Sequence, residues 1–412
     1  MDNTTLEASG ENFMTGGAIQ PQLNDNPGEV VPSDIEFKRN WVFKADAWNE
    51  DHADYAGKNW DNKNLFELKN WDRVWVHNNV FENSWADAQS GYAFVMTPRI
   101  QSGTSYRGHD VTIENNLLRS VCRGFNLSGT DSGDSTGAFK LRRAAIRNNA
   151  LQNVALPLAT LCNNDGTLGN IFTTLNGAMF MDLSYNTASS GRRANYMDIT
   201  AKQQARNRIV GNILDTTTLG WAGSGFTEGN STMAAYMPDS LLTLNVFVAK
   251  TASNYSNHAG NYFPATSAAV RYVNQGVDDR LCTGVNTPVE GCPGASDYLG
   301  LGADMTLIPT VPGSLTGHNP AEQSAYIHTV TSMAASGPCD GTAASDQVVG
   351  GTFFKSDIEI AIGSAGAAAV AVPIQSRTET SMTIRMPSNI AGAYNVAFWR
   401  AGFAAVRSFT CT

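Results

Sequence analysis

An octapeptide of alternating apolar and polar residues recurs along most of the chain. An asparagine occupies its sixth place, and a second short apolar run follows. The copies begin at Ile35, Val74, Val111, Ala144, Met181, Asn207 and Ser240. Their asparagines are Asn40, Asn79, Asn116, Asn149, Asn186, Asn212 and Asn245, spaced by 39, 37, 33, 37, 26 and 33 residues. Period-two alternation predicts a strand on each side of every asparagine. Repetition at this interval is typical of a solenoid, whose units bury their apolar faces against their neighbours.

The repeated asparagine predicts a corner between two strands. Asparagine tolerates the left-handed backbone conformation and hydrogen-bonds locally, so it suits a sharp bend. When such corners stack, the side-chain amides can also bond from one turn of the solenoid to the next. We therefore expect Asn79, Asn116 and Asn149 to stack at one corner inside the solenoid wall. A set of ordinary turn asparagines is the alternative, but it leaves the repeated apolar flanks unexplained.

A third strand is expected before most copies of the octapeptide. The candidate segments begin at Leu6, Leu65, Phe94, Gly124 and Ile171. Three strands per turn, joined by long loops, form a parallel β-helix. Alternation along the second segment places Phe66 and Leu68 inside the solenoid and Glu67 and Lys69 outside.

The asparagine corner and residues 64–85 (NLFELKN…VHNNVFENSW) resemble the pectate-lyase-like superfamily. They are closest to bacterial secreted proteins described only as right-handed parallel β-helix repeat proteins. The resemblance covers roughly residues 5–310 and implies an all-β chain whose residues 1–308 form a right-handed parallel β-helix. That superfamily contains lyases, hydrolases, adhesins and proteins of no known activity. The resemblance is therefore specific for fold and weak for activity.

The pattern changes after residue 308. Residues 309–338 include a stretch rich in proline and glycine, which predicts a linker. Residues 339–412 contain short alternating strands with glycine and proline turns. Their ending, with Pro387, Ala391, Gly392 and Val396, resembles an immunoglobulin-like β-sandwich of the IPT/TIG type. Such domains usually act as spacers or attachment modules on extracellular proteins. The resemblance thus implies attachment to a larger cell-surface assembly, or self-association.

Composition and charge narrow the choice of partners. Charged residues make up 16% of the chain and there are 38 glycines, which favours strands and turns over charged helices. The net charge of −9 argues against nucleic acid, because phosphate binding needs clustered Lys and Arg. No apolar run is long enough to span a bilayer. No signal peptide is present and the chain opens on a strand-like segment, so we expect the natural protein to extend upstream of Met1.

Six cysteines occur in an order that suggests three disulfides. We expect the pairs Cys282–Cys292, Cys339–Cys411 and Cys122–Cys162. An even, nested set of this kind favours an oxidising compartment, hence a secreted or cell-surface protein. The alternative is six reduced cysteines in the core. The sequence contains no Cys-x-x-Cys, which argues against structural zinc or a redox motif.

Candidate chemistry gathers on the outer face of the third strands, where members of the superfamily bind ligands. The residues expected there are Glu7, Glu67, Lys69, Thr97, Arg99, Asn126 and Ser128. This set resembles the needs of a polysaccharide lyase, which removes the proton next to a uronate carboxylate by β-elimination. Lys69 is the candidate base and Arg99 the group that stabilises the developing negative charge.

Calcium is the candidate cofactor of such a lyase. Glu67, together with Asp87 and Asp131 from loops, offers oxygen ligands for Ca²⁺. No ligand spacing in this set is diagnostic. The alternative is that Glu67 and Lys69 pair with neighbours on a wet sheet surface. A hydrolase of the polygalacturonase kind is disfavoured, because no pair of aspartates falls on a third strand.

Aromatic residues gather in the same region. Six of the eight tryptophans lie between Trp41 and Trp85, and Tyr92 is close in sequence. Exposed indole and phenol faces stack on sugar rings, so Trp85 and Tyr92 are candidate glycan-binding residues beside Thr97, Asn126 and Ser128. The alternative is that these rings pin long loops against the helix, since tryptophan is mostly buried.

Two classes of function remain open from the sequence. One is a secreted lyase that cleaves an acidic polysaccharide. The other is a non-catalytic surface protein, either a glycan-binding adhesin or a structural, fibre-forming solenoid.

Overall fold

The computed structural model divides into two compact units. It describes residues 1–16, 32–99, 108–131, 141–155, 162, 169–197, 203–204, 206–282, 295–309, 329–352, 359–363, 370–378, 381–388, 392–400 and 403–412. The first unit comprises Met1–Lys44, Trp48–Asp51 and Gly57–Pro309, and the second comprises the rest. Among the described residues, no helix is both long enough and apolar enough to cross a membrane.

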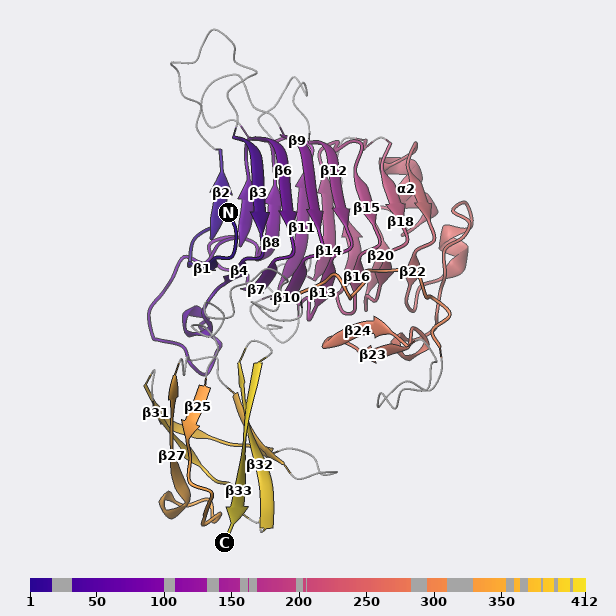
Figure 1. Cartoon of the computed structure of the whole chain (residues 1–412). Coiled ribbons are helices and arrows are strands. Elements are labelled where there is room, and N and C mark those ends of the chain that lie inside the picture. The colour runs from indigo at the N-terminus through magenta and orange to yellow at the C-terminus, as the bar shows by residue number, and fades with distance from the viewer. Residues whose placement is uncertain are drawn as a thin grey trace, which may run out of the picture. The chain divides into compact units, whose positions relative to one another are not determined.

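The first unit is a parallel β-helix built from three long sheets, as predicted (Figure 1). The first sheet contains β21 (Leu241–Thr243), β18 (Arg208–Val210), β15 (Asp182–Ser184), β12 (Arg142–Arg147), β9 (Gly108–Glu114), β6 (Trp71–His77) and β3 (Ser33–Lys38). The second contains β1 (Thr5–Glu7), β4 (Trp41–Phe43), β7 (Val80–Ser84), β10 (Leu117–Val121), β13 (Ala150–Gln152), β16 (Thr187–Ala188), β19 (Ile213–Leu214) and β22 (Val246–Phe247). The third contains β2 (Phe13–Thr15), β5 (Phe66–Leu68), β8 (Tyr92–Met96), β11 (Arg123–Ser128), β14 (Asn170–Leu175), β17 (Arg193–Tyr196) and β20 (Leu219–Trp221).

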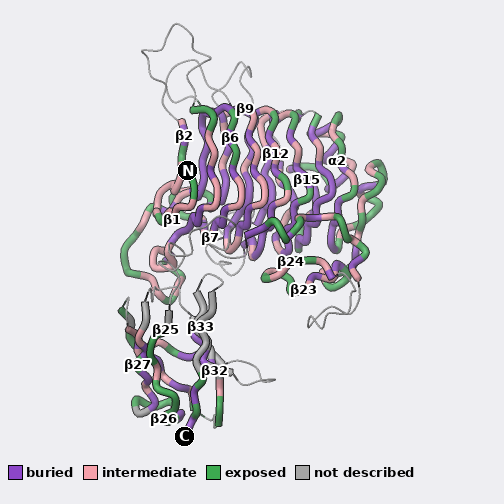
Figure 2. Tube along the Cα trace, in the orientation of Figure 1, coloured by how far each residue is buried: buried purple, intermediate pink, exposed green. Residues whose placement is uncertain are grey.

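One apolar core runs through the middle of the β-helix. Buried positions follow the stacked strands from one rung to the next (Figure 2). The predicted inward residues Phe66 and Leu68 are fully buried in it. Phenylalanines in matching positions of the third sheet stack along the core, with ring centroids 5.2 Å apart from Phe66 to Phe94 and 5.1 Å from Phe94 to Phe125. Burial of these rings is one of the contributions that hold neighbouring rungs together.

The repeated asparagines form a continuous hydrogen-bonded ladder between the first and second sheets. The backbone N–H of Asn79 donates to Asn116 Oδ1 over 2.9 Å, and Asn79 Nδ2 donates to the same oxygen over 2.9 Å. Asn116 and Asn149 repeat this pair of bonds at 3.0 and 2.9 Å. All seven predicted asparagines are fully or almost fully buried. The predicted stacking at one corner is confirmed, and Asn261 extends the ladder by one further step.

The left-handed residue at each corner is the one before the ladder asparagine. The φ angle is 54° at Asn78, 56° at Asn115 and 52° at Asn148. The expectation that the ladder asparagine itself makes the bend by a left-handed conformation is therefore wrong. Its amide instead joins neighbouring rungs, and the residue before it makes the bend. This division of roles accounts for the doublets Asn78–Asn79, Asn115–Asn116 and Asn148–Asn149.

The first predicted third-type strand is misplaced. The segment that begins at Leu6 forms β1, which pairs with β4 in the second sheet and sets Glu7 beside Phe43. The first strand of the third sheet is β2, in which Met14 lies opposite Glu67. The error has a physical cause: a three-residue strand carries too few alternating positions to show which sheet it joins. Its neighbours in space decide that instead.

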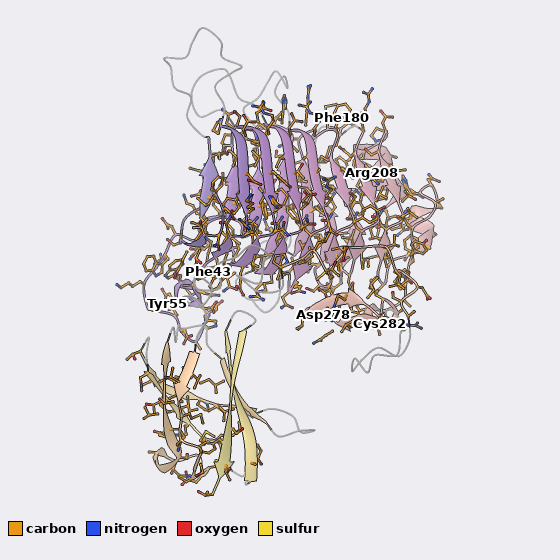
Figure 3. The ribbon with its side chains drawn as sticks, viewed as in Figure 1. Phe43, Tyr55, Phe180, Arg208, Asp278 and Cys282 are labelled. Atoms are coloured by element: carbon orange, nitrogen blue, oxygen red, sulfur yellow. A yellow bond between two sulfur atoms is a disulfide. The ribbon has the colours of Figure 1, made fainter. Side chains whose placement is uncertain are left out.

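A hairpin after the last rung and a short helix between β20 and β21 pack against the β-helix. The hairpin of β23 (Tyr272–Asn274) and β24 (Asp278–Leu281) contacts the second sheet, where Gln152 Nε2 donates to Asp279 Oδ2 over 3.0 Å. Asp278, the first residue of β24, and Cys282, which follows this strand, are labelled in Figure 3. The short helix α2 (Asn230–Tyr236) packs Met233 and Tyr236 into the core.

The second unit contains two small sheets that pack face to face around a separate apolar core. One contains β25 (Thr329–Ser332), β27 (Asp346–Thr352), β31 (Ser381–Arg385) and β30 (Ile374–Arg377). The other contains β26 (Ser336–Gly337), β33 (Phe403–Cys411), β32 (Gly392–Arg400), β28 (Glu359–Gly363) and β29 (Val370–Ala371). The shared core includes Val349 and Ile384 from one sheet and Ile362, Val396 and Phe409 from the other. The predicted all-β class, a β-helix followed by a β-sandwich, is confirmed.

The boundary of the sandwich differs from the sequence prediction. Residues 329–332 and 336–337 fall within the stretch assigned to the linker, yet they form strands β25 and β26. β25 pairs with β27 and β26 pairs with β33, so both belong to the sandwich. Two- and four-residue strands next to a Pro- and Gly-rich segment have too weak a pattern to be recognised without their partners.

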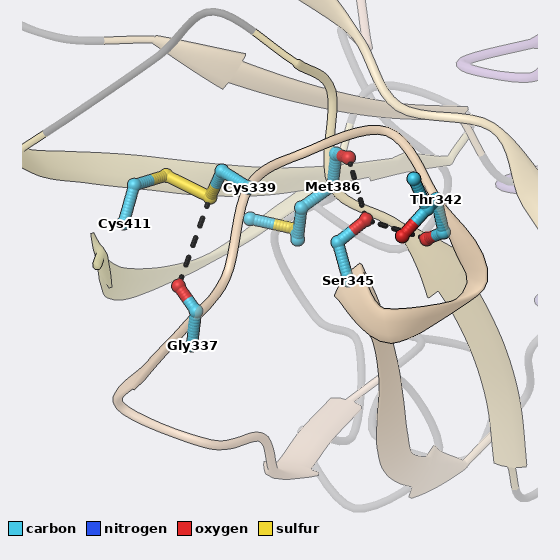
Figure 4. The surroundings of a disulfide bond; sticks show 6 residues. All are labelled: Gly337, Cys339, Thr342, Ser345, Met386 and Cys411. Carbon is cyan, nitrogen blue, oxygen red and sulfur yellow. Dashed lines mark hydrogen bonds between the residues drawn. A yellow bond between two sulfur atoms is a disulfide. The ribbon is translucent and has the colours of Figure 1, made fainter.

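Each of the two units contains a disulfide between two of its own cysteines. Cys122 bonds to Cys162, and Cys339 bonds to Cys411, each pair with Cα atoms 5.4 Å apart, as predicted. The second of these joins the end of β33 to the segment after β26 (Figure 4). Cys282 is also disulfide-bonded, while its predicted partner Cys292 lies outside the described residues.

Candidate functional site

The third sheet brings the two predicted lyase cations onto adjacent rungs. The backbone N–H of Arg99 donates to the carbonyl oxygen of Lys69 over 2.9 Å, just beyond the ends of β5 and β8. Thr97 makes the equivalent bond to Leu68 over 3.0 Å. Adjacent rungs therefore carry Lys69 and Arg99 at the same edge of this sheet.

Each of these cations is paired with a carboxylate of the chain. Lys69 Nζ lies 3.3 Å from Glu67 Oε1, and only 9% of the Lys69 residue is exposed. Arg99 Nε donates to Asp131 Oδ2 over 2.8 Å. The alternative for Glu67 and Lys69 therefore fits in part: the two residues are paired, but they are buried and do not lie on a wet sheet surface. Glu7 takes no part, because it lies in the second sheet.

The three candidate calcium ligands have three separate partners. Glu67 contacts Lys69, Asp131 contacts Arg99, and Asp87 Oδ2 accepts hydrogen bonds from Asn62 N and Nδ2 at 2.8 and 3.1 Å. Within the described ranges, no group of three or more His, Cys, Asp or Glu side chains could hold a metal ion. The calcium site stays a prediction that these contacts do not favour.

The remaining polar candidates on this face differ in exposure. Ser128 is buried, donates from Oγ to Thr130 O over 2.8 Å, and accepts from Asn176 Nδ2 over 3.1 Å. Thr97 and Asn126 are half-buried. Ser128 is thus used internally, and Thr97 and Asn126 are the two of the three with surface to offer a ligand.

The two predicted sugar-stacking rings are buried. Trp85 is 2% exposed and packs with Cys122, Ala155 and Cys162 around the disulfide. Tyr92 is buried in β8, and its hydroxyl donates to Thr173 Oγ1 over 3.1 Å. Neither ring face is open to a glycan, so these two assignments are wrong. The loop-pinning alternative fits Trp85.

Trp75 is the exposed exception among the clustered tryptophans. Trp41 and Trp71 are buried, and Trp48 and Trp60 are half-buried and pack on each other with centroids 5.4 Å apart. Trp75 is 44% exposed. It lies in the middle of β6, where strand alternation turns Val74 and Val76 inward and Trp75 outward.

The Trp75 indole is held in one pose by its neighbours. Its ring stacks on the His77 ring, with centroids 3.9 Å apart and planes 20° from parallel. Its Nε1 donates to Glu114 Oε1 over 2.8 Å, across to the adjacent strand β9. The other oxygen of that carboxylate, Oε2, accepts from Arg147 Nε on β12 over 2.7 Å. His77 Nε2 in turn lies 3.2 Å from Glu36 Oε1 on β3. Four consecutive rungs of the first sheet thus share one polar network around an exposed aromatic ring.

A groove of about 680 Å³ adjoins this network at the asparagine corner. One side is formed by Glu114, Arg147 and Tyr185, and the other by the segment 299–307, which we call the strap. The left-handed corner residues hold the strap in place. Asn78 Nδ2 donates to Leu307 O over 3.2 Å, and Asn148 Oδ1 accepts from Asp304 N.

Two further bonds fix the other end of the strap. Ala303 N donates to Thr187 Oγ1 over 2.8 Å, and Gly302 N donates to Gly211 O over 2.6 Å. A side chain at Gly302, whose φ is 70°, would meet Thr187 and Ile213. The strap therefore crosses the rungs from Gly211 back to Asn78 and forms one wall of the groove along the corner.

Sequence reasoning did not find this site. Trp75 was among the clustered aromatic residues, and its outward position follows from the alternation of β6. The Asn–Asn doublets were a second signal, because the amide of a left-handed corner asparagine lies outside the core and can bond to a neighbouring segment. The strap gave no signal, because it meets Asn78 across 229 residues of sequence.

Comparison with known proteins adds no relative. No protein-family model matches the chain, and no curated protein or solved structure matches it either.

Proposed function

We propose that this protein binds glycans without cleaving them. The binding surface is the outer face of the first sheet around Trp75, together with the groove beside the strap. The exposed, fixed indole of Trp75 is the observation that carries the proposal.

A flat aromatic ring with a polar border suits a sugar. The C–H face of a pyranose packs on an indole face, and its hydroxyls bond to carboxylates, amides and guanidinium groups at the border. Around Trp75 the border is supplied by Glu114 and Arg147, and the groove adds the Asn115–Asn148 pair, in which Asn148 Nδ2 donates to Asn115 Oδ1 over 2.7 Å. Because the ring is already held, little side-chain entropy is lost on binding.

A binding role without catalysis is supported by how the carboxylates and cations are used. Both oxygens of Glu114 are occupied, one by Trp75 and one by Arg147. The lyase candidates Lys69 and Arg99 are likewise paired with Glu67 and Asp131.

An extracellular or cell-surface location belongs to the same proposal. The Cys122–Cys162 and Cys339–Cys411 disulfides support it, because such bonds persist in oxidising compartments. On this proposal, the β-sandwich serves as a spacer or attachment module for a larger surface assembly.

Binding to immobilised polysaccharides tests the proposal. The full chain is mixed with a panel of insoluble neutral and acidic polysaccharides, and bound protein is quantified beside the variants Trp75→Thr and Phe226→Thr. Threonine suits a strand, and Phe226 is a similarly exposed ring outside the first sheet. We expect the parent and the Phe226 variant to bind and the Trp75 variant to lose most binding. Retention of no polysaccharide, or equal retention of both variants, contradicts the proposal.

A polysaccharide lyase is the second candidate, and one observation favours it. The 2.9 Å backbone bond between Arg99 and Lys69 sets two cations on adjacent rungs, where a uronate carboxylate can lie between them. β-Elimination creates an unsaturated uronate that absorbs ultraviolet light. Absorbance is followed during incubation with uronate polysaccharides, with and without Ca²⁺, for the parent and for Lys69→Ala. An increase in absorbance that Lys69→Ala abolishes supports lyase activity. Constant absorbance with every polysaccharide of the panel rejects it.

A further inference from the structure

The groove runs along the axis of the β-helix, across the strands. Its sheet side is built from consecutive rungs, since β9, β12 and β15 are neighbours in the first sheet and carry or precede Glu114, Arg147 and Tyr185. The strap is pinned at Gly211, Thr187, Asn148 and Asn78, in that order. A ligand held between these two walls is therefore extended along the axis.

Two exposed aromatic rings lie along this axis, Trp75 beside the groove and Tyr185 in its lining. Trp75 lies on β6, and Tyr185, which is 36% exposed, follows β15. Three rung steps separate β6 from β15 in the first sheet. At about 4.8 Å per step, the rings are separated by roughly 14 Å along the axis. A hexopyranose unit in an extended glycan advances by about one rung spacing, so about three units fit between the two rings.

The charges that line the groove balance. The charged lining residues are Glu114, Asp304, Arg147 and Arg280, two acids and two bases. Each has a partner within the chain: Arg147 bonds to Glu114, Arg280 bonds to Asp278 through two nitrogens, and Asp304 Oδ1 accepts from Thr306. Because a carboxylate already offsets the charge of each guanidinium, an anionic ligand would gain little net electrostatic attraction in this groove. A neutral ligand can use the remaining hydrogen-bonding capacity of all four residues without breaking any pair.

We infer that the ligand of this groove is a neutral, linear polysaccharide that lies parallel to the β-helix axis. Its sugar units stack on Trp75 at one end and Tyr185 at the other and bond to the Glu114–Arg147 pair between them. This inference rests on the proposed glycan-binding function and adds the charge, the shape and the direction of the ligand.

A length series of oligosaccharides tests the inference by calorimetry. The neutral probes are cello-, xylo- and manno-oligosaccharides of two to six units, and the acidic probes are oligogalacturonates of the same lengths. We expect neutral affinity to rise with length until both rings are covered, at about four to five units, and then to level off. Salt should change it little, because no ion pair forms with the ligand.

The variant Tyr185→Asn separates the two ends of the site. Asparagine tolerates the left-handed conformation of this corner, as Asn78, Asn115 and Asn148 do, so the backbone is preserved. We expect it to weaken the six-unit ligand about tenfold, and the two-unit ligand bound at Trp75 much less. Thermal unfolding checks that the variant is folded.

The outcomes distinguish this inference from the function on which it rests. Binding of none of the probes, together with no retention by the insoluble panel, overturns the proposed function itself. Tight binding of the acidic series alone leaves glycan binding intact and overturns the inferred neutrality. Equal affinity for two and six units, or equal loss at all lengths in the Tyr185 variant, overturns the axial arrangement.

Discussion

A single residue type fills two different roles at the corners of this solenoid. The second asparagine of each doublet is buried and links rungs, as Asn116 does, and the first is left-handed and faces outward, as Asn115 does. The sequence predicted the corner and the stacking, because the apolar flanks fix the register. It could not separate the two roles, because both are properties of asparagine and differ only in what surrounds them.

Loss of one ladder amide should destabilise the β-helix. In Asn116→Ala, the buried N–H of Asn79 loses its acceptor, while Asn79 Nδ2 loses one acceptor and keeps its bonds to Phe37 O and His77 O. Each unpaired buried group costs about 1–3 kcal/mol, so the melting temperature should fall by several degrees. Thermal unfolding followed by circular dichroism measures this, with the exposed Asn257→Ala as control. Equal melting of the two variants would show that the ladder adds no stability.

A buried lysine ties the first rung together. Lys44 is fully buried, and its Nζ lies 2.7–3.2 Å from Ala8 O, Ser9 O, Gly10 O and Asn12 Oδ1. Burial lowers the pKa of Lys44 to about 7, while Glu11 acts in the opposite direction. The four oxygens also stabilise the ammonium form.

Lys44 should make stability rise with pH above neutrality. The folded pKa, about 7, lies below the unfolded value of 10.5, so the unfolded chain holds the proton more tightly between these values. Unfolding free energy then increases by up to about 1.4 kcal/mol per pH unit across that window. Denaturant titrations at several pH values compare the parent with Lys44→Met. The difference between the two proteins removes the contribution of the other titrating groups, which both share. Parallel curves for the two proteins would mean that Lys44 stays charged throughout.

At the scale of elements, the corner opposite the asparagine ladder is marked by alternating charge. Asp34, Arg73, Asp110 and Arg143 are left-handed residues at the start of successive first-sheet strands. Arg73 bonds to Asp34 through two nitrogens, and Arg143 bonds to Asp110 in the same way. Each of these four residues lies six positions before a ladder asparagine. The alternation of acid and base is therefore present in the sequence, but it becomes visible only when the repeats are aligned on their asparagines.

The β23–β24 hairpin should loosen as pH rises. Burial raises the pKa of Asp279, which Gly276 N–H and Gln152 Nε2 contact. The folded value lies above the unfolded value of 3.8, so docking is favoured below about 3.8 and weakens as pH rises through the folded pKa. Hydrogen exchange of residues 272–281 should speed up across that window beyond its intrinsic pH dependence. Asp279→Asn should remove this additional pH dependence of the exchange rate. If the additional pH dependence is unchanged in the variant, Asp279 is not its cause.

At the scale of the molecule, the sequence predicted the architecture but misplaced the candidate site. The same corner with apolar flanks occurs seven times, so the repeat predicts a β-helix even if one copy is unclear. The outward-facing residues do not repeat from rung to rung, so no comparable pattern identifies the exposed ones. Lys69 faces outward in the expected sheet but is covered and paired with Glu67, whereas Trp75 faces outward on a different sheet and stays exposed. Which outward residues remain accessible depends on the strap and loops, whose positions arise from contacts far apart in the sequence.

Oxidative footprinting with bound glycan tests the central claim most directly. The full chain is exposed to hydroxyl radicals with and without a retained polysaccharide, and side-chain oxidation is quantified by mass spectrometry. Trp75 and Tyr185 are exposed on the proposed surface, while Met14 and Phe226 are comparably exposed elsewhere on the β-helix. We predict that the glycan protects Trp75 and Tyr185 and leaves Met14 and Phe226 unchanged. Protection of Met14, which contacts Lys69, with none at Trp75 would contradict the account and return the ligand to the third sheet.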